Sequence, residues 1–237
     1  MTTAGEGTMT SFKALDKEKF VIELNCNLPK EIKAGAALEN LEWTPNFTVK
    51  NSYFGPSRAR GLLVSTPGKV IIENNTFASS GSAILIPGDA NDWYESGACK
   101  DVLIKGNTFL YPCNSTDGYQ FCQAIITIEP QIPSPDPKRT YHRNIRIEDN
   151  KFNPFDAPIL FARSVEHLTF VNNTITRSYE YEPYHPRKEG IILEVCKDVT
   201  IKGNKIEGDV LGKDISLVNM KRKELSLDKK EYFKVKK

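Results

Sequence analysis

The sequence predicts an all-β protein, a right-handed single-stranded parallel β-helix of about six coils. Three observations predict this fold: a six-fold internal repeat, short strands within each repeat, and the lack of amphipathic helical segments between those strands. At 237 residues the chain is long enough to bury a sizeable core. We expect residues 1–40 to form a lead-in and cap, residues 41–219 the β-helix, and residues 220–237 a basic tail.

The repeat is a six-residue pattern that starts with an apolar residue, continues with turn-forming Asn, Asp or Gly, and ends with an aromatic or aliphatic residue. Its copies end at Phe54, Phe77, Phe109, Phe152, Ile175 and Ile206. The intervals between these ends are 23, 32, 43, 23 and 31 residues. The shortest interval fits one bare coil, so the longer intervals contain inserted loops.

Each repeat contains two strands joined by a polar turn. The first strand alternates apolar and polar residues, as in residues 145–148, so that one face is buried. The second is almost continuously apolar, as in residues 83–86, which is typical of a buried parallel sheet. One turn position holds Ser52, Asn75, Asn107, Asn150, Asn173 and Asn204. Stacked coils would align these side chains into an asparagine ladder.

Composition excludes several classes of function. The net charge of +2 gives no electrostatic reason to expect a nucleic-acid partner, and no apolar run approaches the roughly 18 residues of a membrane span. No signal peptide is visible near the start of the sequence. His142, His167 and His185 have no ligand spacing, so we expect no metal site and no cofactor. Cys113 and Cys122 form either a disulfide in an oxidising compartment or two buried thiols.

The loop after Ile86 is the first candidate for chemistry, because function in a repeat protein belongs to what interrupts the repeat. It contains three carboxylates and two large aromatic residues, Asp89, Asp92, Trp93, Tyr94 and Glu95. Cleavage of a glycosidic bond needs one carboxyl group as general acid and a second as base or nucleophile. The indole face can bind the apolar side of a sugar ring. The alternative is a solvated acidic loop with a packed Trp.

Glu129 provides a second carboxylate from the next coil. Aligning the second strands at Ala83 and Ala124 places Asp89 and Glu129 at the same strand end with a one-residue stagger. The two backbones would then be about 6 Å apart. The carboxyl groups would come near the roughly 6.5–9.5 Å spacing of inverting glycosidases, while the retaining spacing of about 5 Å stays open.

The preceding coil supplies four candidates for substrate binding, Arg58, Arg60, Thr66 and Lys69. Their donors can bond sugar hydroxyls, or the two arginines can pair with acidic residues of adjacent coils. Glu194 has two interpretations as well: it points into the same groove, or it pairs with Arg163.

Several stretches of the chain share loop residues with one known family: residues 58–69, 72–77, 83–89, 93–97, 119–122 and 125–130. On these stretches the segment from Trp43 to about Glu129 resembles glycoside hydrolase family 110, the bacterial α-1,3-galactosidases. The resemblance implies metal-independent, inverting hydrolysis of terminal α-1,3-linked galactose, the linkage of blood group B glycans. We assign Asp89 and Glu129 as the acid/base pair, with Asp92 and Glu95 as substitutes.

The resemblance also raises expectations about the whole protein. Members of that family are longer, with further coils and small β domains on the N-terminal side, and they are generally exported. We therefore expect a secreted or periplasmic protein that is a fragment, a truncated homologue or an assembly partner. An uncapped coil end would favour self-association. The competing functions are a non-catalytic glycan-binding β-helix and a pectin-type polysaccharidase.

Overall fold

The computed structural model describes residues 5–90, 92–95, 97–111, 113, 123–132, 134–230 and 232–236, and it divides into two compact units, Met1–Glu39 and Asn40–Lys237. The division falls next to the boundary expected after residue 40. The smaller unit contains one antiparallel hairpin, β1 (Met9–Ala14) and β2 (Phe20–Leu24). None of its described residues is buried.

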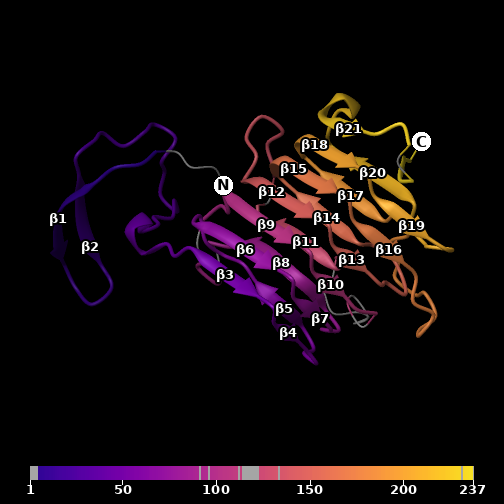
Figure 1. The fold of residues 1–237 in the computed structure, drawn as a ribbon. Coiled ribbons are helices and arrows are strands. Elements are labelled where there is room, and N and C mark those ends of the chain that lie inside the picture. Colours follow the sequence, from indigo (N-terminus) through magenta and orange to yellow (C-terminus); the bar gives the residue numbers. More distant parts are fainter. Residues whose placement is uncertain are drawn as a thin grey trace. The chain divides into compact units, whose positions relative to one another are not determined.

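The larger unit is a parallel β-helix made of three sheets (Figure 1). Sheet 1 contains β3 (Phe47–Lys50), β6 (Lys69–Glu73), β9 (Asp101–Lys105), β12 (His142–Glu148), β15 (Val165–Val171), β18 (Lys197–Lys202) and β21 (Leu225–Leu227). Sheet 2 contains β4 (Tyr53–Phe54), β7 (Thr76–Phe77), β10 (Thr108–Phe109), β13 (Lys151–Phe152), β16 (Thr174–Thr176) and β19 (Lys205–Glu207). Sheet 3 contains β5 (Arg60–Leu63), β8 (Ser82–Gly88), β11 (Ile126–Pro130), β14 (Leu160–Arg163), β17 (Ile191–Glu194), β20 (Asp214–Val218) and β22 (Lys234–Val235).

The chain visits the three sheets in turn, so each coil contributes one strand to each sheet. Two short 3-10 helices, η1 (Leu41–Trp43) and η2 (Arg222–Glu224), lie at the two ends of this unit in sequence. The expected parallel β-helix is confirmed, with six coils that contain all three strands. No helix in the described part of the chain is long and apolar enough to cross a membrane.

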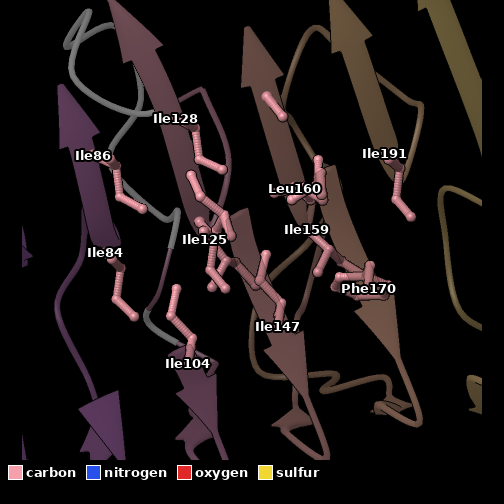
Figure 2. Packing of buried hydrophobic residues seen from close by; sticks show 14 of the residues in the cluster. Ile84, Ile86, Ile104, Ile125, Ile128, Ile147, Ile159, Leu160, Phe170 and Ile191 are labelled. Carbon is pink, nitrogen blue, oxygen red and sulfur yellow. The ribbon is translucent and has the colours of Figure 1, made fainter. Parts of the chain in front are cut away.

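The core lies between the three sheets. Alternate residues of each strand point inward, and Figure 2 shows Ile84, Ile104 and Ile147 among the buried cluster that they form. The residues that end the repeat stack from coil to coil on sheet 2. Ring centroids are 5.2 Å apart for Phe77 and Phe109, and the contact continues to neighbouring coils. The repeat therefore encodes the core directly.

The asparagine ladder is confirmed. The Nδ2 of Asn107 donates to the Oδ1 of Asn150, and the Nδ2 of Asn150 donates to the Oδ1 of Asn173. The residue before each ladder position has a positive φ, for example 56° at Asn74 and 55° at Asp149. This left-handed conformation is the one that Asn, Asp and Gly tolerate best, which explains their presence in the turn.

Residues 220–237, expected to form a basic tail, instead contain β21 and β22. These strands extend sheet 1 and sheet 3, and Leu225 and Phe233 are buried. The buried thiol of Cys113 forms no disulfide, and its Sγ donates a hydrogen bond to the carbonyl of Phe77. Burial raises the pKa of this thiol to about 12. The expected partner of this thiol, Cys122, lies outside the described residues.

Candidate active site

The candidate site lies on the outer face of sheet 3, where the strands end. Ile128 of β11 belongs to the main core, so the alternation of the strand turns Glu129 to the outside. Further back along the strands, three residues form an apolar cluster separate from the core: Ala124, Phe161 and Ile192. This outer face is therefore partly covered, and charged groups on it are shielded from water.

The strand register fixes how Asp89 and Glu129 lie relative to each other. Glu129 pairs with Pro87 of β8, so Asp89 lies two residues beyond it on the adjacent coil. The one-residue stagger that follows from aligning Ala83 with Ala124 is wrong, because β11 is shifted by one position. A coil rise of about 4.8 Å and two residues of about 3.3 Å place the two Cα atoms about 8 Å apart.

The loop after β8 folds back on its first residue. Asp89 is only 5% exposed, and its Oδ1 accepts a hydrogen bond of 3.1 Å from the backbone N–H of Asp92. Its carbonyl oxygen accepts a second bond of 2.7 Å from the N–H of Glu95. Between these anchors the Asp92 side chain is exposed, and Trp93 and Tyr94 are each 80% exposed. The loop thus buries the carboxyl group of Asp89 and presents two aromatic rings to solvent.

Glu95 comes from the same loop and is partly buried. Its Oε2 atom is buried and has no hydrogen-bond partner among the described residues. Burial and the nearby charge of Asp89 raise the pKa of the Glu95 carboxyl, while the guanidinium of Arg60 partly offsets the rise. Glu95 and Asp89 therefore form a close pair of carboxyl groups, of which Glu95 retains its proton more readily than an ordinary glutamate does.

Glu129 lies among charges of both signs. Burial raises the pKa of its carboxyl, the guanidinium groups of Arg163 and Arg187 lower it, and the carboxylate of Glu194 raises it. Arg163 Nε is 3.4 Å from Glu194 Oε2, so Glu194 pairs with Arg163, while its effect on Glu129 places it on the same outer face. Part of the positive charge of Arg163 is thus neutralised by its partner, and Glu129 keeps a raised pKa despite two neighbouring arginines.

Two residues near the site were missed from the sequence. Arg187 belongs to the loop between β16 and β17, and its Cζ lies 5.1 Å from the ring centroid of Phe161. Tyr141 packs against the end of β8: a Cβ added to Gly88 would be 2.4 Å from the Tyr141 ring. The long insertions before β12 and β17, rich in Pro, Tyr and charged residues, were the available signal.

The four substrate-binding candidates lie in different surroundings. Arg60 begins β5 and interacts with Glu95, whereas Arg58 precedes that strand and is exposed. Thr66 is buried, and its hydroxyl donates to the carbonyl of Pro45. Lys69 begins β6 and thus belongs to sheet 1. Arg60 thus acts on a carboxyl group of the site, that of Glu95.

His142 and His167 make contacts within the β-helix. His142 is fully buried, its Nδ1 accepts from the N–H of Cys99, and burial lowers its pKa to about 3. The Nδ1 of His167 lies 2.5 Å from Asp198 Oδ2 on an exposed surface. Across the described residues, no group of three or more His, Cys, Asp or Glu side chains is placed to hold a metal ion.

The chain is similar to several curated proteins. It is 60% identical over all 237 residues to Alpha-1,3-galactosidase B of Bacteroides thetaiotaomicron, of which it spans 38%. It is 46% identical over 191 residues, 79% of its own length, to Alpha-1,3-galactosidase A of Bacteroides fragilis, of which the match spans 31%. It is 42% identical over 204 residues, 84% of the chain, to Alpha-1,3-galactosidase B of Akkermansia muciniphila, of which the match spans 25%. No protein-family model matches the chain.

Proposed function

We propose that this chain, which belongs to the alpha-1,3-galactosidase family over the part that it spans, takes part in cleaving terminal α-1,3-linked galactose from glycans of the blood group B type. The observation that carries the proposal is the gathering of Asp89, Glu95 and Glu129 at one edge of sheet 3, with two of the three pKa values raised. Glycoside hydrolysis needs a carboxyl group that holds its proton next to one that does not.

We assign Glu129 as the general acid and Asp89 as the general base. The raised pKa of Glu129 keeps a proton available for the glycosidic oxygen as the bond to the anomeric carbon breaks. Asp89 would accept a proton from a water molecule that attacks the anomeric carbon from the opposite side. In this inverting mechanism the attacking water lies between the two carboxyl groups. The product would be β-galactose.

Other residues would bind the sugar. The exposed ring of Trp93 offers a flat apolar surface for one face of galactose, and Arg60 and Arg187 offer donors for its hydroxyl groups. These roles follow from exposure and from the nearness of each group to Glu95 or Glu129.

The test is hydrolysis of galactosyl-α-1,3-galactose, with proton NMR of the first galactose released. Early β-galactose indicates inversion. We expect Asp89→Asn and Glu129→Gln each to lower kcat about 10²- to 10⁴-fold, because each removes one proton-transfer group. Glu148→Gln, at the end of β12 in sheet 1, is the matched control and should leave the rate unchanged. Loss on Glu95→Gln but not on Glu129→Gln would transfer the acid role to Glu95.

A second candidate function is glycan binding without catalysis, favoured by the 80% exposure of both Trp93 and Tyr94. In that case the folded protein would release no galactose. Its affinity for the disaccharide would fall with Trp93→Ala and would be unaffected by Asp89→Asn and Glu129→Gln.

A further inference from the structure

Asp156 is a buried carboxylate outside the group of residues assigned to the reaction. Its side chain is 1% exposed, although it lies in a connection between β13 and β14 at the surface of the β-helix. Its Oδ2 accepts hydrogen bonds of 2.6 Å from the backbone N–H groups of Tyr184 and His185, and its Oδ1 accepts one of 2.8 Å from Ala157. Three backbone donors on a buried carboxylate form a strong, charge-assisted anchor.

The anchor holds a segment that has no regular secondary structure. Tyr184 and His185 belong to the loop between β16 and β17, one coil away from Asp156. The Nδ1 of His185 accepts a hydrogen bond of 3.1 Å from the N–H of Arg187. Asp156 thus fixes the backbone two residues before Arg187, and His185 transmits that constraint to Arg187 itself.

Arg187 leaves this anchored segment toward the candidate site. Its guanidinium lies over the ring of Phe161, a residue 4% exposed on the outer face of sheet 3, one coil from Glu129. A guanidinium stacked on an aromatic ring is oriented and partly desolvated, which strengthens its action on nearby charges. The direction in which Arg187 points therefore depends on the backbone held by Asp156.

We propose that Asp156 is a positioning residue for the candidate active site, which holds Arg187 over Phe161 on the outer face of sheet 3, one coil from Glu129. Asp156 does not touch the reacting groups itself. This inference rests on the proposed function for its catalytic meaning, but the coupling between Asp156 and Glu129 exists whether or not the chain hydrolyses a glycan.

The charges that face Glu129 decide the sign of the effect. Arg163 comes from β14, Glu194 from β17 and Arg187 from the anchored loop. Arg163 and Glu194 pair with each other, so they keep their places when the loop loosens. Replacing the Arg187 guanidinium removes a charge that lowers the pKa of Glu129, so we expect that pKa to rise further.

The experiment is a pH titration of the Glu129 carboxyl carbon by NMR in the whole chain labelled with 13C-glutamate, with the resonance assigned by its absence in Glu129→Gln. We expect Asp156→Asn to raise the titration midpoint of Glu129, because an amide oxygen cannot replace the charged anchor. Arg187→Met should raise the midpoint in the same direction, and the double variant should add nothing to Arg187→Met alone. Glu182→Gln removes an exposed carboxylate from the same loop and should leave the midpoint unchanged.

The titration separates this inference from the proposed function. A rise in both variants supports the coupling even where no galactose is released. An unchanged midpoint in Arg187→Met, which removes no buried anchor, overturns the inference while leaving the hydrolase proposal intact. If Asp156→Asn does not fold, Arg187→Met and its rescue by Arg187→Lys still test the action of the guanidinium on Glu129. Strictly additive shifts in the double variant would also overturn it, since Asp156 would then act independently of Arg187.

Discussion

Asn150 shows how one ladder residue satisfies the buried backbone on both sides of a coil. Its Oδ1 accepts hydrogen bonds of 2.9 and 3.1 Å from the backbone N–H and the Nδ2 of Asn107. Its Nδ2 donates to the carbonyl of Ile104 and to the Oδ1 of Asn173, each at 3.0 Å. The side chain is 1% exposed, so water cannot replace these partners. Removing the amide would leave several polar groups unpaired at once.

We therefore expect Asn150→Ala to lower the free energy of unfolding by about 3 kcal/mol or more, because each unpaired buried group costs roughly 1–3 kcal/mol. Asn153→Ala is the matched control, since the half-buried Asn153 side chain donates one hydrogen bond, from Nδ2 to the carbonyl of Thr176. Its loss should cost about 1 kcal/mol. Urea unfolding of both variants measures the difference. Equal losses would show that the ladder adds nothing beyond ordinary hydrogen bonds.

His142 makes stability depend on pH. Burial lowers its pKa from 6.5 to about 3 in the folded protein, so between these values the unfolded chain binds a proton that the native chain does not. The free energy of unfolding therefore falls as the pH falls through this window, by at most about 1.4 kcal/mol per pH unit from this residue. His142→Asn keeps an acceptor for the N–H of Cys99 and removes the titrating group. The variant should show a shallower pH dependence in urea unfolding between pH 6 and pH 4, and parallel curves would contradict the prediction.

At the scale of elements, strand identity was predictable and strand register was not. The repeat places strong turn residues at one position of every coil, so the ladder and the stacked rings follow from sequence alone. Sheet 3 lacks such a marker because the positions 85, 161 and 192, on its outer face, are apolar like its core positions. The shared Ala-Ile pair suggests aligning Ala83 with Ala124, whereas the structure places Ile84 opposite Ile126. The polar Thr127 between two core isoleucines was the residue that indicated the correct face.

The loops between elements explain why the candidate site was predicted only in part. The acidic residues near β8 and β11 are visible as composition, and the structure brings Asp89 and Glu95 together by a backbone hydrogen bond. Arg187 reaches the outer face of sheet 3 from a separate insertion, through contacts with Asp156 that span 28 and 29 residues. Such contacts depend on how a loop folds back over a coil, and no periodic pattern encodes them.

At the scale of the whole molecule, the extent of the β-helix was underestimated at its C-terminal end. Residues 220–237 contain many lysines, which suggested a solvated tail. Within this stretch, however, Leu225 and Leu227 are separated by one polar residue, as are Phe233 and Val235, and this short alternation is enough to add strands at the edges of sheet 1 and sheet 3. Phe233 is fully buried and packs edge-on against Phe170. The high lysine content of residues 220–237 drew attention away from the alternation of apolar and polar residues that is typical of strands.

The stacked coils predict a gradient of local stability along the molecule. Each coil contacts only its neighbours, so terminal coils open at lower cost than central ones. Ile104 and Ile147 of the central coils are fully buried, whereas Leu63 of β5 is 44% exposed and Val218 of β20 is 37% exposed. Hydrogen exchange of the whole chain, followed by mass spectrometry, should therefore be slowest in peptides that cover β9 and β12.

Exchange should be faster in peptides that cover β3 to β5 and β20 to β22, and fastest in residues 5–39, none of which is buried. The fully unfolded chain in denaturant supplies the reference rate for each peptide. Uniform protection through all coils of the β-helix would instead mean that it opens as one cooperative unit. The candidate site would then have the global stability of the fold. If protection instead falls toward the ends, β11, which contains Glu129, and β8, which precedes Asp89, should be well protected. Both strands are paired on both edges.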